Sequence, residues 1–299
     1  MNPKLLVVGL AELTGRPLPR IPEPDLVMDD PDKVAAYTRA GREDGVMAPV
    51  YLFHCLHLCE VIRPGDTVLD LGCGPATQLA MVARLNPETR FIGVDLSPEM
   101  LDRATTYVHE QGLDNVEFIL SDVQHIRALE DQSVDVVMSS MALHHLPDVA
   151  ALDATLGEID RLLKPGGGLY LADFGRLSSR LGMTYFAYQY ADRQPELFTL
   201  DYLYSLQAAF SLEEWRQAWR NRLAERGRLS ATFLIPFLVT IKSPPRRAIP
   251  PEIRQKLAQF HAQMPSWHRR DFNDLCTFLR MGTTPLPLDH QHTGYGSSA

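Results

Sequence analysis

TVLDLGCGPAT, residues 67–77, decides the fold of this chain. The apolar run over 67–71 predicts a buried strand that is covered on both faces. Gly72 and Gly74 follow it, and glycine permits backbone conformations and close approaches that a Cβ atom would block. Pro75 ends the strand, so the helix expected next directs its N-terminus at the turn, where a cofactor would bind.

This turn departs from the fingerprint of a nicotinamide dinucleotide site at two positions. The fingerprint has glycine where this chain has Thr77, and the acidic Asp70 before the glycines also differs from it. A nicotinamide cofactor is therefore disfavoured.

An acid ends the second predicted strand, residues 90–97. Asp95 lies 23 residues after Gly72, where α/β nucleotide sites place a carboxylate that accepts both ribose hydroxyls. Asp95 could instead cap the following helix, but Ser97 before Pro98 can supply that cap itself. We therefore expect Asp95 to face a ligand.

Strand and helix alternate as far as about residue 175. Beyond 90–97, strands are predicted at 115–122, 134–140 and within 162–175, with helices from Pro98 and over 149–163. The apolar residues of each helix share one face. This order predicts an α/β fold with a doubly wound parallel sheet and right-handed crossovers.

Five motifs in this order together resemble the class I S-adenosylmethionine-dependent methyltransferases of the small-molecule type. They are DLGCGPAT (70–77), VDLS (94–97), ILSDVQ (119–124), VVMSSMALHHLPD (136–148) and LLKPGGGLYLADF (162–174). The resemblance covers residues 67–175 and departs at Ala76, where the family commonly has a third glycine. It implies a seven-stranded Rossmann-like sheet whose last strand, residues 231–242, is antiparallel.

The resemblance also implies S-adenosyl-L-methionine as the cofactor and gives its contacts. Gly72 and Gly74 would lie against its methionine and ribose portions, and Asp95 would bind the ribose diol. Asp122 with Val123 would meet the adenine, although Asp122 could also be a turn acid. Asp70 would orient the amino group of the cofactor. Two residues at strand ends, Leu96 and Ser140, are also expected to bind the cofactor.

The resemblance implies that an acceptor attacks the sulfonium methyl group of the cofactor. If the acceptor carries a proton, a base must remove it. ALHHLPD places His144 and His145 after the fourth strand, at the edge where ligands bind in open α/β sheets. We favour His145 as the base; alternatively it orders the loop while His144 packs behind it. Tyr37 resembles a tyrosine that latches such a site in some relatives.

Residues 176–210 are rich in aromatic side chains that suit either an apolar substrate pocket or ordinary packing of a lid. The substrate contacts expected are Asp173, at the end of the fifth strand, together with Tyr185 and Tyr188. No motif identifies the acceptor.

Composition excludes several classes of function. The net charge of −8 argues against a nucleic-acid partner, and no 18-residue apolar run is present to span a membrane. Four cysteines without a CxxC pair fit a reduced, cytoplasmic protein. Cys55 and Cys59 are interpreted as a buried helix face and His290 and His292 as part of a flexible tail, so no metal site is predicted.

Residues 216–256 hold ten basic side chains against two acidic ones. A solvated helix face is one interpretation of this basic stripe. The other is a docking surface for a protein, RNA or carrier-bound substrate. A non-catalytic cofactor-binding subunit is a third alternative to a small-molecule enzyme.

The predicted organisation has a central domain with added segments. An extended N-terminal arm (1–29) and lid helices (30–64) precede a cofactor-binding domain (65–242) that carries a lid insertion (176–210). Two further helices (243–282), which could close the site or form a homodimer contact, and a flexible tail (283–299) follow.

Overall fold

A seven-stranded sheet forms the centre of the molecule in a computed structural model that describes residues 3–16, 18–24 and 30–282. The strands are β1 (Thr67–Leu71), β2 (Arg90–Asp95), β3 (Val116–Leu120), β4 (Val134–Ser140), β5 (Leu163–Phe174), β6 (Arg228–Ala231) and β7 (Leu238–Lys242). Their spatial order is β3-β2-β1-β4-β5-β7-β6, in which β7 runs antiparallel to both of its neighbours, β5 and β6, and the pairs among β1 to β5 are parallel. The predicted Rossmann-like sheet is confirmed.

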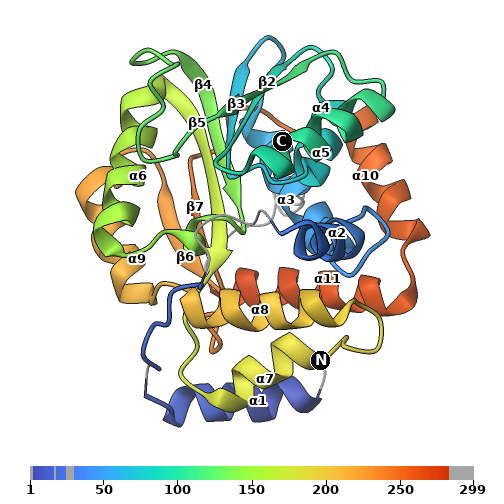
Figure 1. Cartoon of the computed structure of the whole chain (residues 1–299), viewed down its shortest axis with the longest axis vertical. Helices are drawn as coiled ribbons and strands as arrows, with labels where there is room; N and C mark the ends of the chain where they lie inside the picture. The colour runs from blue at the N-terminus through green and yellow to red at the C-terminus, as the bar shows by residue number, and fades with distance from the viewer. Residues whose placement is uncertain (1–2, 17, 25–29, 283–299) are drawn as a thin grey trace, which may run out of the picture.

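Helices cover both faces of this sheet, as Figure 1 shows. On one side lie α3 (Ala48–Val61), α4 (Thr77–Leu85), α5 (Pro98–Glu110), α10 (Pro251–Gln263) and α11 (Ser266–Met281). On the other lie α6 (Val149–Leu162) and α9 (Leu212–Arg222). Neighbouring residues of β1 face opposite layers, Val68 toward the first and Leu69 toward the second, because strand side chains alternate.

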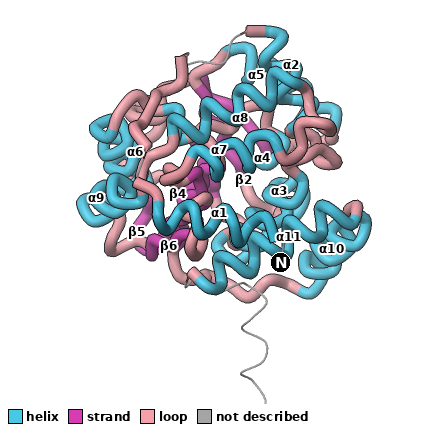
Figure 2. The backbone as a smooth tube through the Cα atoms, turned by 90° about the horizontal axis from the view of Figure 1, so that it is seen from below, coloured by secondary structure: helices cyan, strands magenta, loops and turns pink. Residues whose placement is uncertain are grey.

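A third layer crosses the end of the sheet. It consists of α1 (Pro3–Thr14), α7 (Arg180–Tyr188) and α8 (Glu196–Ala208), which Figure 2 shows in front of the strands. The apolar residues Val8, Leu177 and Leu206 join it to Phe174 at the end of β5. The predicted lid over 176–210 is therefore helical, and it lies at the edge where the parallel strands end.

Two expectations need correction. The N-terminal arm is not extended throughout, because residues 3–14 form α1, whose Val8 is buried against the lid. The single strand expected over 231–242 is in fact two strands, β6 and β7, since Pro236 lies in the connection between them. Proline has no N–H to donate to a strand neighbour, which accounts for the break.

Local capping follows the sequence closely. Asp30 accepts hydrogen bonds at the start of α2 (Pro31–Ala40), and Ser211 forms a capping box with Glu214 at the start of α9. Cys55 and Cys59 are fully buried on α3, as the buried-face interpretation predicts. No helix among the described residues combines the length and apolarity needed to cross a membrane. The tail with His290 and His292 lies outside the described residues.

Candidate functional site

The glycine turn after β1 has a left-handed backbone at both glycines, with φ +69° at Gly72 and +52° at Gly74. A Cβ at Gly72 would lie 2.4 Å from the Cβ of Ala142, whereas a Cβ at Gly74 would meet no atom within 4 Å. Gly72 is thus required for packing against the loop after β4. Gly74 instead borders open space, as a position that lies against a ligand should.

Ala76, the position that departs from the family pattern, is also left-handed, with φ +62°, at the N-terminal end of α4. This conformation costs a residue with a Cβ about 1–2 kcal/mol. A glycine would adopt it without that cost, which explains physically why glycine is common there. The chain keeps the turn's shape despite the substitution.

Asp95 connects the glycine turn to the end of β2. Its Oδ2 accepts a hydrogen bond from the Gly74 N–H at 2.8 Å, and its Oδ1 accepts one from the Ser97 N–H at 2.9 Å. The Ser97 hydroxyl caps α5 by accepting from the Met100 N–H. Burial raises the pKa of Asp95 above its ordinary value, although these backbone donors oppose the shift. Because Ser97 caps the helix, Asp95 remains at the cavity wall.

A cavity of about 210 Å³ opens where β1, β2, β3 and β4 end. Its lining includes most of the predicted cofactor and catalytic residues, namely Tyr37, Gly72, Gly74, Asp95, Leu96, Asp122, Val123 and His145. Asp70 and Ser140 are not among the lining residues, and Asp70 is only 3% exposed within β1. Burial and the Asp95 charge raise the pKa of Asp70 well above its ordinary value.

His144 lies behind the cavity and is held by a carboxylate. Its Nδ1 is 2.7 Å from Asp173 Oδ1, and its backbone N–H donates to Asp173 Oδ2 at 3.0 Å. Both side chains are buried, at 3% and 1% exposure. Asp173 thus orients His144 and lines neither this cavity nor a second one described below, which removes the basis for its predicted contact with substrate.

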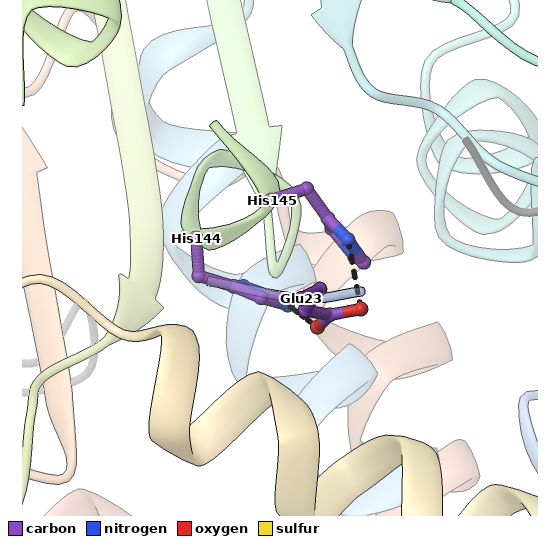
Figure 3. A group of neighbouring side chains, drawn as sticks. All are labelled: Glu23, His144 and His145. Carbon is purple, nitrogen blue, oxygen red and sulfur yellow. Dashed lines mark ion pairs between the residues drawn. The ribbon is translucent and has the colours of Figure 1, made fainter. Parts of the chain in front are cut away.

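His145 faces the cavity and pairs with Glu23, a residue of the N-terminal arm. Its Nδ1 lies 3.2 Å from Glu23 Oε2, and the other carboxylate oxygen lies 3.7 Å from His144 Nε2 (Figure 3). Burial lowers the pKa of His145, but the hydrogen bond and charge of Glu23 outweigh burial, and the pKa stands above its ordinary value. We call Glu23, His144 and His145 the histidine–glutamate cluster.

Arg20 fixes the arm to the loop that carries both histidines. Its guanidinium donates to the carbonyl oxygens of His144, Leu146, Pro147 and Ala208. It also lies 4.0 Å from the ring centroid of Phe210. Glu23 is held from the side of α8, because the Ser205 hydroxyl donates to it at 2.9 Å.

The sequence reasoning missed Glu23 and Arg20. No local motif surrounds either residue, and their partners lie more than a hundred positions away in the chain. The signal that could have pointed to them is the pair of consecutive histidines, which needs an acid nearby to fix its tautomers.

Tyr37 lines the cavity from α2 and contacts the Phe198 ring, with the centroids 5.9 Å apart. Burial raises the pKa of Tyr37, so it remains a neutral phenol. No hydrogen bond within the described parts of the chain joins Tyr37 to His145. The latch implied by the resemblance is therefore not formed in this arrangement.

A second, aromatic cavity of about 140 Å³ lies under the lid. It is lined by residues of α7, α8 and α11, among them Tyr185, Phe186, Phe198, Tyr202 and Phe278. Tyr185 thus lies at a pocket, as predicted, but Tyr188 lies at the end of α7, is 45% exposed and lines neither cavity. The aromatic lid residues enclose space as well as packing against each other. The C-terminal helix α11 completes the wall.

Six of the ten basic side chains in the stripe of residues 216–256 form ion pairs with acids of the chain itself. Ion pairs of 2.5–2.7 Å join Arg222 to Asp153, Arg226 to Asp160, Lys242 to Glu60 and Arg246 to Asp66. Arg216 and Arg220 both lie 3.7 Å from Glu213. These five acids offset part of the stripe's positive charge and hold most of the paired side chains against the protein's own surface.

Comparisons with known proteins agree with this architecture. A family model described as a methyltransferase domain matches residues 62–222. An uncharacterized 37.1 kDa protein in transposon Tn4556 of Streptomyces fradiae is 40% identical over 112 residues, which cover 37% of this chain and 31% of that protein. An arsenite methyltransferase of Halobacterium salinarum is 35% identical over 113 residues, covering 38% of this chain and 28% of the relative. The matched segment thus spans about a third of the length of these two relatives.

A ubiquinone biosynthesis O-methyltransferase of Xanthomonas campestris is 29% identical over 167 residues, which are 54% of this chain and 67% of that protein. Among solved structures, the plantazolicin methyltransferase BpumL has a TM-score of 0.54 at 16% identity, covering 79% of this chain and 87% of its own. A methyltransferase from Aquifex aeolicus has a TM-score of 0.51 at 20% identity, with 72% and 98% covered. Both structures share the fold.

Proposed function

This chain belongs to the class I S-adenosylmethionine-dependent methyltransferases, and we propose that it transfers a methyl group from that cofactor to a small-molecule acceptor at oxygen, nitrogen or carbon. The observation that carries the proposal is the hydrogen bond from Gly74 to Asp95, 2.8 Å long. It joins the glycine turn and the carboxylate proposed to bind the ribose in the wall of a cavity that His145 also lines.

The residues present fit the cofactor. Gly74 leaves a space that a Cβ would enter, and Asp95 presents its carboxylate beside it. Asp122 and Val123, at the end of β3, would hold the adenine, with Met100 of α5 as a further apolar contact. When bound, the cofactor supplies an electrophilic methyl group, and the walls of the cavity fix the direction from which an acceptor can approach it.

The histidine–glutamate cluster is where we place loss of the acceptor's proton. His145 is its member on the cavity wall, and Glu23 balances positive charge that develops on the imidazole. Asp173 holds His144 through Nδ1, so His144 supports the cluster from behind. Tyr37 borders the same space as a neutral donor.

The aromatic cavity is the proposed entry for the acceptor. Only one layer of rings separates it from the cluster: Phe174 is 5.2 Å from the His144 ring and 5.5 Å from the Tyr202 ring that lines the cavity. An apolar acceptor of small size suits such a wall. The names of the relatives support small-molecule acceptors as a class, without identifying this one.

Incubation with methyl-labelled cofactor and a cell extract tests the proposal. We expect the label to appear in a low-molecular-weight compound, and to remain with the cofactor when Asp95→Ala replaces the wild type. Label in protein or RNA instead would support the docked-substrate alternative. Cofactor binding without any labelled product would support a non-catalytic subunit.

A further inference from the structure

We propose that the histidine–glutamate cluster is a binding site for one divalent transition-metal ion, with Zn²⁺ the natural probe. The ligands would be Glu23 through its carboxylate, His144 through Nε2 and His145 through Nδ1. One ligand atom of each of the three residues lies within 4.8 Å of the others, and the residues come from two segments far apart in the sequence (Figure 3).

The chemistry of the donor set fits such an ion. Two imidazoles and one carboxylate are the protein ligands of a common type of catalytic zinc site, which keeps a fourth position open. Ligand atoms about 2 Å from a tetrahedral ion are about 3.3 Å from each other. His145 Nδ1 lies 3.2 Å from one oxygen of the Glu23 carboxylate and His144 Nε2 lies 3.7 Å from the other, so a small adjustment of the carboxylate would bring both imidazoles into range of one ion.

His144 gives an independent argument. Its side chain is 3% exposed, and its Nε2 is buried with no hydrogen-bond partner. Because a carboxylate only accepts, Asp173 fixes the proton on Nδ1 and leaves a lone pair on Nε2. That lone pair points at the Glu23 carboxylate, which is also an acceptor, so a cation between them would satisfy both.

The surroundings resemble those that support metal ligands elsewhere. Asp173 holds His144 through the nitrogen that would not bind the ion, and such carboxylate–histidine contacts orient the ring and raise its basicity. Ser205 donates to Glu23 in the same supporting way. Two of the three ligands, His144 and Glu23, are thus oriented by neighbours in the described structure before any ion binds.

The position of the ion suggests a role for it in methyl transfer. This role rests on the proposed function, whereas the binding site itself does not. His145 lines the cofactor cavity, so the open coordination position would be reached from there. An acceptor hydroxyl bound to the ion would release its proton more readily to solvent water in the open cavity, because a bound cation lowers the pKa of its ligand. With the ion in place His145 is a ligand and no longer the proton acceptor.

The test uses the full-length protein without a histidine tag. After treatment with a chelator and dialysis against Zn²⁺, we expect one zinc per chain by elemental analysis. Co²⁺ in its place should show the visible absorption of a four-coordinate site without a thiolate charge-transfer band. Glu23→Gln and His144→Gln should each weaken binding at least tenfold, and Asp173→Asn about 10–100-fold.

His109→Gln is the matched control, since His109 is an exposed histidine outside the cluster, and it should bind zinc as the wild type does. A variant with His290 and His292 both replaced should also keep the ion. Thermal unfolding of each metal-free variant shows whether it is folded. Less than 0.2 zinc per chain, or binding unchanged in folded Glu23→Gln and His144→Gln, would overturn the site. Calorimetry of S-adenosylmethionine binding in the absence of zinc tests the proposed function separately. If the cofactor binds but zinc does not, the metal site is wrong and the proposed function is unaffected.

Discussion

Gly72 and Gly74 have the same backbone conformation, and replacing each by alanine should have different consequences. Both substitutions place a Cβ on a left-handed residue, which costs about 1–2 kcal/mol. At Gly72 the new Cβ also overlaps Ala142 at 2.4 Å, and such overpacking adds about 1–3 kcal/mol. We expect a loss of unfolding free energy of about 1–2 kcal/mol for Gly74→Ala and about 2–5 kcal/mol for Gly72→Ala.

Cofactor affinity should follow a different order. The Cβ of Gly74→Ala would enter the space beside Asp95, so we expect S-adenosylmethionine to bind at least tenfold more weakly, or about 1.4 kcal/mol, to a protein that is still folded. Urea unfolding measures the loss of unfolding free energy, and calorimetry measures the affinity for S-adenosylmethionine.

The double variant Gly72→Ala/Ala142→Gly is the internal control. It removes the atom that the new Cβ meets, so a double-mutant cycle should show about 1–3 kcal/mol of favourable coupling between the two positions. Equal stability of Gly72→Ala and Gly74→Ala, or unchanged cofactor affinity in Gly74→Ala, would refute this account of the turn.

Three further predictions concern the cofactor acid, the buried histidines and the basic stripe. Asp95→Asn should weaken cofactor binding at least tenfold in calorimetry, because the amide presents only one acceptor oxygen to the Gly74 N–H and the ribose. Burial lowers the pKa of His54 to about 3 and that of His57 well below 6.5, so both stay neutral in the folded protein while the unfolded chain takes up protons below pH 6.5. The unfolding free energy in urea should therefore fall by about 1.4 kcal/mol per pH unit for each histidine below that pH, and His54→Gln should reduce the slope by about that amount. Reversing the charges of Arg216 and Arg220 should leave methyl transfer and its salt dependence unchanged.

Each has a result that would count against it. For the acid, Asp102→Asn on the exposed face of α5 is the control, and equal binding by both variants would remove Asp95 from the site. For the histidines, the same pH slope with and without His54 would mean that its protonation is not linked to unfolding. For the basic stripe, methyl transfer that falls with salt in the wild type but not in the charge-reversed variant would support the docking hypothesis.

The parts of the site that could be predicted are those carried by contiguous motifs. Gly72, Gly74 and Asp95 follow directly from two strands and the turns after them, because a parallel sheet places successive strand ends side by side. His145 was placed for the same reason. Asp70 precedes the turn by only two positions, yet it is buried in β1, since helices cover both faces of this central strand.

The rest depended on long-range packing. Glu23 reaches the histidines because Arg20 holds the arm against the loop after β4, and nothing near Glu23 in the sequence records that contact. Tyr185 and Tyr188 belong to one aromatic segment, but only Tyr185 lines a cavity, whereas Tyr188 is the last residue of α7 and is exposed to solvent. Composition predicted the aromatic lid and could not choose its members.

The attachment of the arm through Arg20 also has a consequence for how the protein matures. The segment that supplies Glu23 is synthesised before the loop it joins, and the carbonyl groups of His144, Leu146 and Pro147 that hold Arg20 belong to residues made more than a hundred positions later. Closing so long a loop is slow compared with forming the local helices and turns. The cluster is therefore completed late in folding, after strands β1 to β4 have been synthesised, so the glycine turn and Asp95 can be in place before Glu23 meets the two histidines.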